Sequence, residues 1–258
     1  MIPATFQVGS IEFHLYGILV SLGIAAGYFL ARVRAVKFKI SRDIVDTLVL
    51  ILIPVCLVGA RLYHVLDNFD YYFKNPNEII AIWQGGIGIL GAIIFGVITL
   101  WIFSKHKKLN FLTLFDLAAP SITLAQAIGR WGNFINQEAF GMPVKSIWGI
   151  FIPVEKRLPG YENIEYYFPT FLIESIWLLI VTFILLKYKP RKPGLATGVF
   201  LILYGSGRIV VEVLRINTWQ VFGIKVGLFV SILFVFLGFY IFLQKRKKSE
   251  QSNFRIYK

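Results

Sequence analysis

Seven long apolar segments constrain this chain more than any other feature. A helix needs about 20 mainly apolar residues to cross the hydrocarbon core of a membrane, where open sheet edges are too costly. The chain has 258 residues, of which 57% are hydrophobic and only 16% charged, and its mean hydropathy is +0.68. We therefore expect an all-α, polytopic membrane protein with about seven transmembrane helices. The predicted spans are residues 11–31, 44–66, 79–103, 111–128, 169–186, 196–214 and 226–243.

Basic residues predict the orientation of these spans. They gather in segments 32–42, 104–108, 187–192 and 244–248, which together with Arg255 and Lys258 hold 18 of the 27 Lys and Arg residues. Because cytoplasmic loops carry the excess of Lys and Arg, we expect the N-terminus outside and the C-terminus in the cytoplasm. Residues 1–258 then form a single transmembrane domain, in which residues 142–168 are a small head segment at the outer face.

Several classes of protein are disfavoured by composition. The net charge of +13 lies beside the spans, where it contacts anionic membrane lipids, so we expect no nucleic-acid partner. The first residues carry no basic region, and we expect the first span to be retained rather than cleaved. A single cysteine, Cys56, excludes an internal disulfide and favours a packing role. His14, His64 and His106 lack ligand spacing, so no metal centre is expected.

Polar groups in and beside the spans are costly and therefore indicate a site. Residues 129–141 read GRWGNFINQEAFG, with one arginine, two asparagines, one glutamate and three glycines where span four is predicted to end. Residues 204–215 read YGSGRIVVEVLR, in which Arg208, Glu212 and Arg215 follow one helical stripe. With Arg130 they supply three guanidiniums, which suit phosphate oxygens, so the pattern predicts a site for a phospholipid headgroup.

Plainer interpretations stay open for the same residues. Arg208 and Glu212 can form a structural ion pair, with Arg215 marking the end of the helix. Arg61, in the motif GARL, can extend to the membrane interface without binding anything. The small residues of segment 85–96 are explained by close helix packing. Glu174 is expected to pair with one of the arginines in a structural role.

The segment 129–141 resembles the signature of the prolipoprotein diacylglyceryl transferases, bacterial membrane enzymes that begin lipoprotein maturation. Further similarity lies in YG at Tyr16, GARL at Gly59, WQGG at Trp83, DLAAPS at Asp116, PTFLIES at Pro169 and YGSGRIVVEVLR at Tyr204. The resemblance implies transfer of the diacylglyceryl group from phosphatidylglycerol to the lipobox cysteine of a prolipoprotein signal peptide. Glycerol phosphate leaves, and no cofactor or metal is needed. The expected location is the cytoplasmic (inner) membrane, with the active site toward the outer face.

The resemblance also implies roles for individual residues. Arg130 and Arg208 are the expected catalytic residues, and Asn136 is expected to hold a turn. Arg61 completes the predicted phosphatidylglycerol site if it does not simply reach the interface. The other residues expected to bind phosphatidylglycerol are Arg130, Asn133, Glu138, Gly141, Tyr16, Glu212 and Arg215.

Four positions depart from the family pattern, and each departure is apolar. Leu90 stands where many members have histidine or tyrosine, Phe168 and Ile173 replace a histidine and a tyrosine around PT-x-x-x-E, and Phe140 replaces a frequent histidine. A histidine base at these positions is therefore absent. We expect the positive potential of Arg130 and Arg208 to favour the thiolate instead.

Two other functions remain as alternatives. The apolar replacements fit a catalytically weak or inactive relative that binds lipid or prolipoprotein. Intramembrane arginines also occur in anion or lipid transporters. The predicted charges lie toward one membrane face rather than along a path through the bundle, which favours the transferase.

Overall fold

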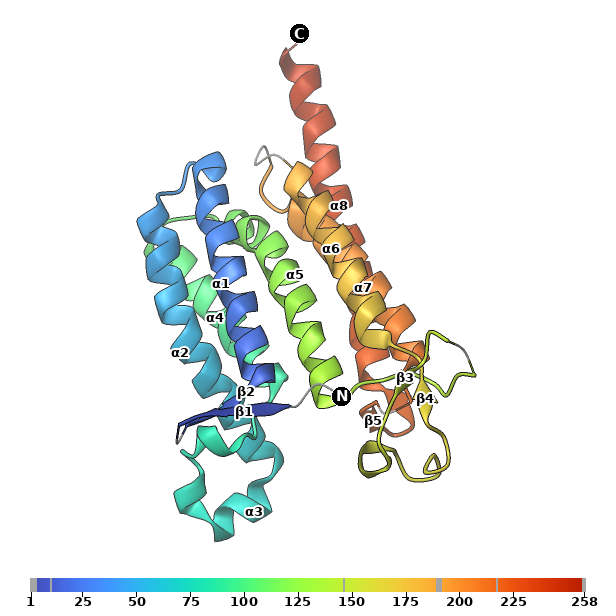
Figure 1. The fold of residues 1–258 in the computed structure, drawn as a ribbon. Coiled ribbons are helices and arrows are strands. Elements are labelled where there is room, and N and C mark those ends of the chain that lie inside the picture. Colours follow the sequence, from blue (N-terminus) through green and yellow to red (C-terminus); the bar gives the residue numbers. More distant parts are fainter. Residues whose placement is uncertain (1–3, 10, 146, 189–191, 217, 257–258) are drawn as a thin grey trace. The chain divides into compact units, whose positions relative to one another are not determined.

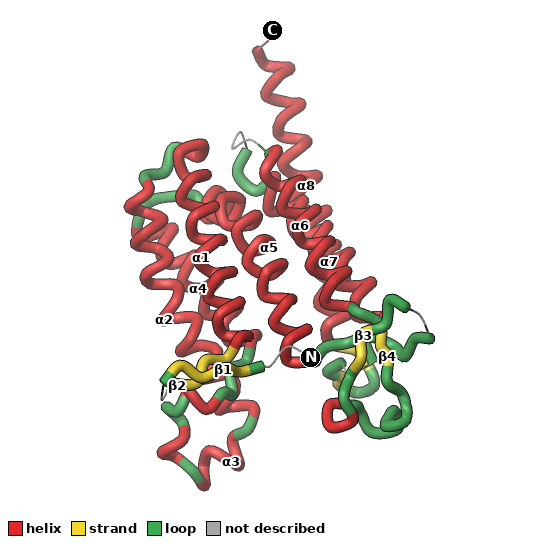
Figure 2. The backbone as a smooth tube through the Cα atoms, in the orientation of Figure 1, coloured by secondary structure: helices red, strands yellow, loops and turns green. Residues whose placement is uncertain are grey.

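Helices account for most of the structure. The computed structural model describes residues 4–256 apart from 10, 146, 189–191 and 217. Within these residues, seven helices are long and apolar enough to cross a membrane, and strands form only short pairs (Figure 2). The prediction of an all-α, multi-pass membrane protein is confirmed.

The elements follow one another as helices joined by short turns and hairpins. The α-helices are α1 Leu15–Ala35, α2 Arg42–Asp67, α3 Phe69–Lys74, α4 Ile89–His106, α5 Phe111–Asn136, α6 Thr170–Lys187, α7 Leu195–Leu214 and α8 Val226–Ile256. Short 3₁₀ turns cover Val36–Phe38, Pro76–Glu78, Ile82–Gln84 and Val154–Lys156. Three antiparallel pairs join β1 Thr5–Val8 with β2 Ile11–His14, β3 Ile150–Phe151 with β4 Tyr166–Tyr167, and β5 Gln220–Val221 with β6 Ile224–Lys225.

The helices belong to two compact units. Unit 1 comprises the described residues of 1–31 and 116–258, and unit 2 comprises residues 32–115. In unit 1, α7 packs along both α6 and α8 (Figure 1). Gly198 of α7 and Gly238 of α8 face each other so closely that a Cβ on Gly198 would lie 3.0 Å from the Gly238 carbonyl oxygen. Small residues therefore allow these two helices to approach.

In unit 2, α2 and α4 pack together in the same way. Gly91 of α4 lies against the backbone of Gly59, and a Cβ on Gly96 would lie 3.1 Å from the Cys56 sulfur. Helix packing thus explains Gly91 and Gly96, and Cys56 lies at the helix contact. The packing prediction for both is confirmed.

Several helix boundaries differ from the predicted spans, and the last helix, α8, continues to Ile256 instead of ending at residue 243. Residues 11–14 form a strand, and the first helix begins at Leu15. The third begins at Ile89 rather than at residue 79, because Gly85 and Gly86 adopt positive φ angles of 91° and 73°, which end regular helix there. The fourth continues to Asn136, so Arg130 and Asn133 lie on a helix, and Asn136 is its last residue.

The head segment has a small core of its own. Phe140, Ile152 and Tyr167 are buried together, and the rings of Phe140 and Tyr167 are 4.6 Å apart between centroids. Arg157 donates hydrogen bonds to the carbonyls of Ile152 and Glu162, at 2.9 and 2.6 Å. These contacts give the described part of the head segment a fold of its own, and the Gln137 side chain of the signature donates to its Phe151 carbonyl at 3.5 Å.

A buried carboxylate joins α5 to the start of α7. Asp116 accepts hydrogen bonds from the backbone nitrogens of Gly194 and Thr197, at 2.7 and 2.6 Å, and from the Thr197 hydroxyl. The first N–H groups of a helix have no partner within the helix, and a carboxylate there is favoured by the helix dipole. Asp116 thus caps a helix to which it does not belong.

Replacing Asp116 by alanine should destabilise the protein by roughly 1–3 kcal/mol, because buried N–H donors would lose their acceptor. We expect a lower midpoint of thermal unfolding in detergent, and a smaller decrease for Asp116→Asn, which keeps one acceptor oxygen. Asp70→Ala, at an exposed carboxylate of α3, is the control. An unchanged midpoint for Asp116→Ala would show that this cap contributes nothing.

Candidate functional site

Three arginines of unit 1 converge on one buried carboxylate. Glu174 of α6 lies with Oε1 2.8 Å from Arg130 of α5 and 3.0 Å from Arg208 of α7, and with Oε2 3.4 Å from Arg215. Arg208 also pairs with Glu212 at 3.0 Å. We call these five residues the charged cluster. The predicted convergence of the guanidiniums, the pairing of Glu174 with arginine and the pairing of Arg208 with Glu212 are all confirmed.

Side chain to backbone hydrogen bonds bring the helices of the cluster together. The Ser175 hydroxyl donates to the Ala127 carbonyl at 2.8 Å, which joins α6 to α5. The Trp177 indole donates to the Leu203 carbonyl at 2.9 Å, which joins α6 to α7. Ser175 directly follows Glu174 in the sequence, and Trp177 lies three residues after it. The helices that carry Arg130, Glu174 and Arg208 are therefore fixed close to the level of the cluster.

The signature continues from Arg130 as a chain of hydrogen bonds. Arg130 donates to the Asn133 side-chain oxygen at 3.1 Å, and the Asn133 amide donates to Glu138 at 2.8 Å. The backbone reverses here, with positive φ angles of 52° at Gln137 and 56° at Ala139. Asn133 and Glu138 therefore orient Arg130.

Gly141 lies where the head segment meets the end of α7. It forms an isolated antiparallel bridge with Arg215, and its N–H donates to the Phe168 carbonyl at 2.9 Å. A Cβ on Gly141 would lie 2.9 Å from Thr170 Cγ2 and 3.0 Å from the Leu214 carbonyl oxygen. The structure thus gives Gly141 a packing role beside the cluster, and its contact with lipid stays a prediction.

Lys225 is a cluster neighbour that the sequence did not reveal. Its ammonium donates to the carbonyls of Glu212 and Arg215, at 3.1 and 3.3 Å. A cation at a helix C-terminus satisfies carbonyls that lack a partner and is favoured by the helix dipole. In the sequence, this residue is only a lysine that follows the charged stripe. Its contact with α7 depends on the β5–β6 hairpin, which was not predicted.

Tyr16 lies near the signature, at the start of α1. Its ring packs so closely on Gly132 that a Cβ there would lie 2.6 Å from ring atom Cδ2. The Tyr16 side chain is partly exposed. Gly132 therefore makes room for a tyrosine that also faces solvent or lipid.

The charged cluster has more positive than negative charge. It holds three guanidiniums and two carboxylates, and Glu174 is only 3% exposed, whereas the arginines are 13–21% exposed. The Nε groups of Arg130 and Arg215 are buried, with no hydrogen-bond partner among the residues that the structure describes. Burial lowers the pKa of Arg215, which follows the last residue of α7, to about 10, so it stays protonated at neutral pH. An anion with several acceptor oxygens would balance such a site.

Arg61 belongs to unit 2, where backbone carbonyls surround its guanidinium. It donates to the carbonyls of Glu78 and Ile79, at 2.5 and 2.8 Å, and to those of Gly85 and Gly86, at 2.7 and 2.9 Å. These bonds hold the turns between α3 and α4. Arg61 thus has a structural role in its own unit, and its predicted contact with phosphatidylglycerol stays a prediction.

The four apolar residues that depart from the family pattern lie in packing or exposed positions. Phe140 belongs to the core of the head segment, and the Phe168 backbone pairs with Gly141 and Met142. Ile173 of α6 is 37% exposed, and Leu90 lies in the first turn of α4 in unit 2. None of the four supplies a titratable group.

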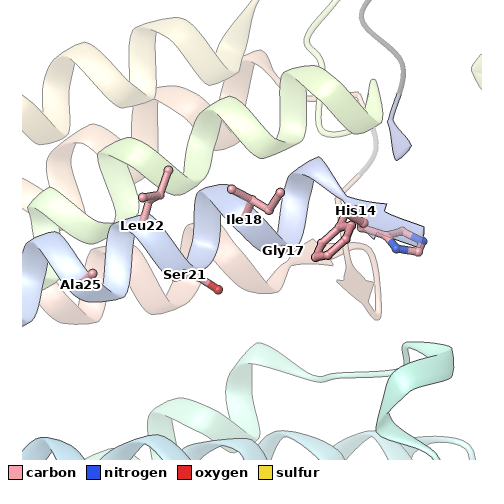
Figure 3. A pocket seen from close by; sticks show the side chains of 7 residues that line it. His14, Gly17, Ile18, Ser21, Leu22 and Ala25 are labelled. Carbon is pink, nitrogen blue, oxygen red and sulfur yellow. The ribbon is translucent and has the colours of Figure 1, made fainter. Parts of the chain in front are cut away.

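A shallow groove of about 590 Å³ runs along the start of α1 (Figure 3). It contains no member of the charged cluster, and its lining is mostly apolar. Its lining residues are Phe13, His14, Gly17, Ile18, Ser21, Leu22 and Ala25. The chemistry of the site therefore rests on the cluster rather than on this groove. Over the described part of the chain, no group of three His, Cys, Asp or Glu residues is arranged to hold a metal.

Comparison with known proteins shows the family of this chain. The sequence pattern of the family described as "Prolipoprotein diacylglyceryl transferase" matches residues 3–244. A phosphatidylglycerol–prolipoprotein diacylglyceryl transferase from Streptococcus pyogenes is 38% identical over 252 residues, which are 96% of each chain. One from Streptococcus uberis is 38% identical over 251 residues, which are 95% of this chain and 96% of the relative. Since the match covers nearly the whole chain, this protein belongs to the prolipoprotein diacylglyceryl transferase family.

Proposed function

We propose that this protein transfers the diacylglyceryl group of phosphatidylglycerol to the lipobox cysteine of a prolipoprotein. The observation that carries the proposal is the convergence of Arg130, Arg208 and Arg215 in a cluster with excess positive charge. The lipid substrate carries one phosphate with negative charge, and guanidiniums bind phosphate oxygens through paired hydrogen bonds. The relatives carry this activity in their names.

The reaction is a displacement at carbon. The cysteine sulfur attacks the glycerol carbon that bears the phosphate, a carbon–sulfur bond forms, and the carbon–oxygen bond to phosphate breaks. The thiol gives its proton to water, and the electrons of the broken carbon–oxygen bond leave with glycerol phosphate. Negative charge therefore builds on the phosphate oxygens, where positioned cations lower the barrier.

Arg130 and Arg208 are the proposed catalytic residues. Arg130 binds the phosphate before reaction, and its buried Nε–H has no acceptor among the described residues. Arg208, held between Glu174 and Glu212, stabilises the departing phosphate. The other proposed lipid contacts are Arg215, Asn133, Glu138, Gly141, Glu212, Tyr16 and Arg61.

Thiol activation proceeds without a histidine at the four departing positions. A thiolate is the attacking species, and nearby positive charge lowers the pKa of a thiol. The excess positive charge of the cluster supplies that field. Leu90, Phe140, Phe168 and Ile173 therefore remove a base but not the electrostatic route.

The site acts at the outer face of the cytoplasmic (inner) membrane under this proposal. Basic segments follow the first, third, fifth and seventh spans, whereas the cluster, the head segment and the hairpin β5–β6 lie at the opposite helix ends. Phosphatidylglycerol of the outer leaflet and an exported signal peptide reach this side.

Arg130→Ala should lower transfer by at least about 10²-fold, because it removes a charged partner of the phosphate. The protein should remain folded, since Glu174 keeps Arg208 and Arg215. The assay uses purified protein in detergent, labelled phosphatidylglycerol and a lipobox peptide, and measures the thioether product. Arg32→Ala, which breaks the ion pair with Asp46 in unit 2, is the matched control.

The same assay separates the transferase from a binding-only relative, which the apolar departures would suit. A peptide with serine in place of cysteine should give no thioether. Retained lipid without product from the wild-type protein would establish binding only. Wild-type turnover by Arg130→Ala would remove this residue from the proposed site.

Gly132→Ala should lower transfer by at least about tenfold, because the added methyl group displaces Tyr16 from the signature. Gly129→Ala is a close control: a Cβ at Gly129 meets nothing within 4 Å, and alanine favours helix. We expect normal transfer from Gly129→Ala. Equal activity of the two variants would show that the position of Tyr16 does not matter for the reaction.

A further inference from the structure

Glu174 contacts all three arginines of the charged cluster. Its Oε1 lies between Arg130 and Arg208, at 2.8 and 3.0 Å, and its Oε2 lies 3.4 Å from Arg215. The three arginines come from α5, α7 and the residue after α7, whereas Glu174 comes from α6. One side chain thus joins every element that contributes a guanidinium.

Other carboxylates near the cluster do not take this place. Glu212 pairs with Arg208, four residues before it on the same helix. Glu138 accepts a hydrogen bond from Asn133. Among the described residues, neither of these glutamates forms a salt bridge with Arg130 or Arg215. A cluster without Glu174 would therefore keep only the Arg208–Glu212 pair on α7.

Electrostatic repulsion makes the positions of the three arginines depend on their shared contact with Glu174. Three guanidiniums repel one another strongly in a poorly solvated site, and a buried charge is tolerated only when it is paired and hydrogen-bonded. Without an anion at their centre the arginine side chains would separate. Glu174 is 3% exposed, so water does not replace it.

Glu174 holds the arginines without using up their donors. A guanidinium has five N–H groups, and each of the three arginines has one nitrogen paired with Glu174. The buried Nε groups of Arg130 and Arg215 have no partner among the described residues. Donors therefore remain for the oxygens of a phosphate that enters beside the carboxylate.

We infer that Glu174 is a positioning residue, which arranges the three arginines for the phosphate before the lipid arrives. The inference rests on the proposed function. It goes beyond a structural ion pair, because it predicts different effects of Glu174 on lipid binding and on turnover. Loss of the Glu174 negative charge leaves the site more positive, so the anionic lipid still binds. The arginines, however, are no longer positioned next to the phosphate oxygens on which negative charge builds in the transition state. Turnover should fall while lipid binding persists.

The test compares Glu174→Gln and Glu174→Asp with the wild-type protein. Full-length protein in detergent is assayed with phosphatidylglycerol and the lipobox peptide for kcat and for the KM of the lipid, and thermal unfolding is recorded for each variant. We expect Glu174→Gln to lower kcat by roughly 10²-fold without raising KM. Glu174→Asp keeps the charge but is one methylene shorter and cannot reach all three arginines, so it should unfold near the wild-type temperature and also lose kcat.

Asp46→Asn is the matched control, because it breaks an arginine–carboxylate pair of 3.0 Å in unit 2. It should leave kcat and KM unchanged. If Glu174→Gln does not fold, Glu174→Asp decides the question. A wild-type kcat in a folded Glu174 variant, or a raised KM with unchanged kcat, overturns the inference.

The result also separates this inference from the proposed function. Wild-type protein that forms no thioether contradicts the proposed function, and the inference falls with it. Wild-type product that is lost in Arg130→Ala but kept in both Glu174 variants leaves the function in place and removes only the positioning role.

Discussion

The cost of bringing several positive charges into an apolar bundle governs the arrangement of unit 1. Three arginines cannot share a poorly solvated site unless an anion lies between them. Glu174 is that anion in the protein alone, and the helices α5, α6 and α7 are joined around it. The positive charge that remains suits a phosphate. The packing of these helices and the excess of positive charge at their centre are thus parts of one electrostatic arrangement.

Much of this arrangement was predictable from the sequence, because it depends on patterns along one helix. Hydropathy predicted the spans, and the spacing of Arg208, Glu212 and Arg215 predicted their common stripe. The signature indicated that Arg130 would join them. Glu174 was expected to pair with an arginine, yet its contact with all three depends on where α5, α6 and α7 lie, which no local pattern contains.

Several unpredicted features arise from contacts between segments that are distant in the sequence. Arg61 donates to the carbonyls of residues 78, 79, 85 and 86, which lie in turns although this apolar segment was predicted to begin a span. Asp116 caps α7 from α5, across about eighty residues of sequence, and Lys225 reaches α7 only through a hairpin. In each case a polar side chain forms hydrogen bonds with backbone groups that are far from it in the sequence.

Both ends of helix α7 are held by hydrogen bonds to other segments. Asp116 holds its first N–H groups, while Lys225 and the Gly141–Arg215 bridge hold its last residues. Sliding of α7 along its own axis would break both sets of bonds at once. These contacts therefore fix the position of its arginines along the helix axis relative to α5 and the β5–β6 hairpin. The bonds that hold the two ends of α7 thus also set the height at which Arg208 and Arg215 meet Glu174.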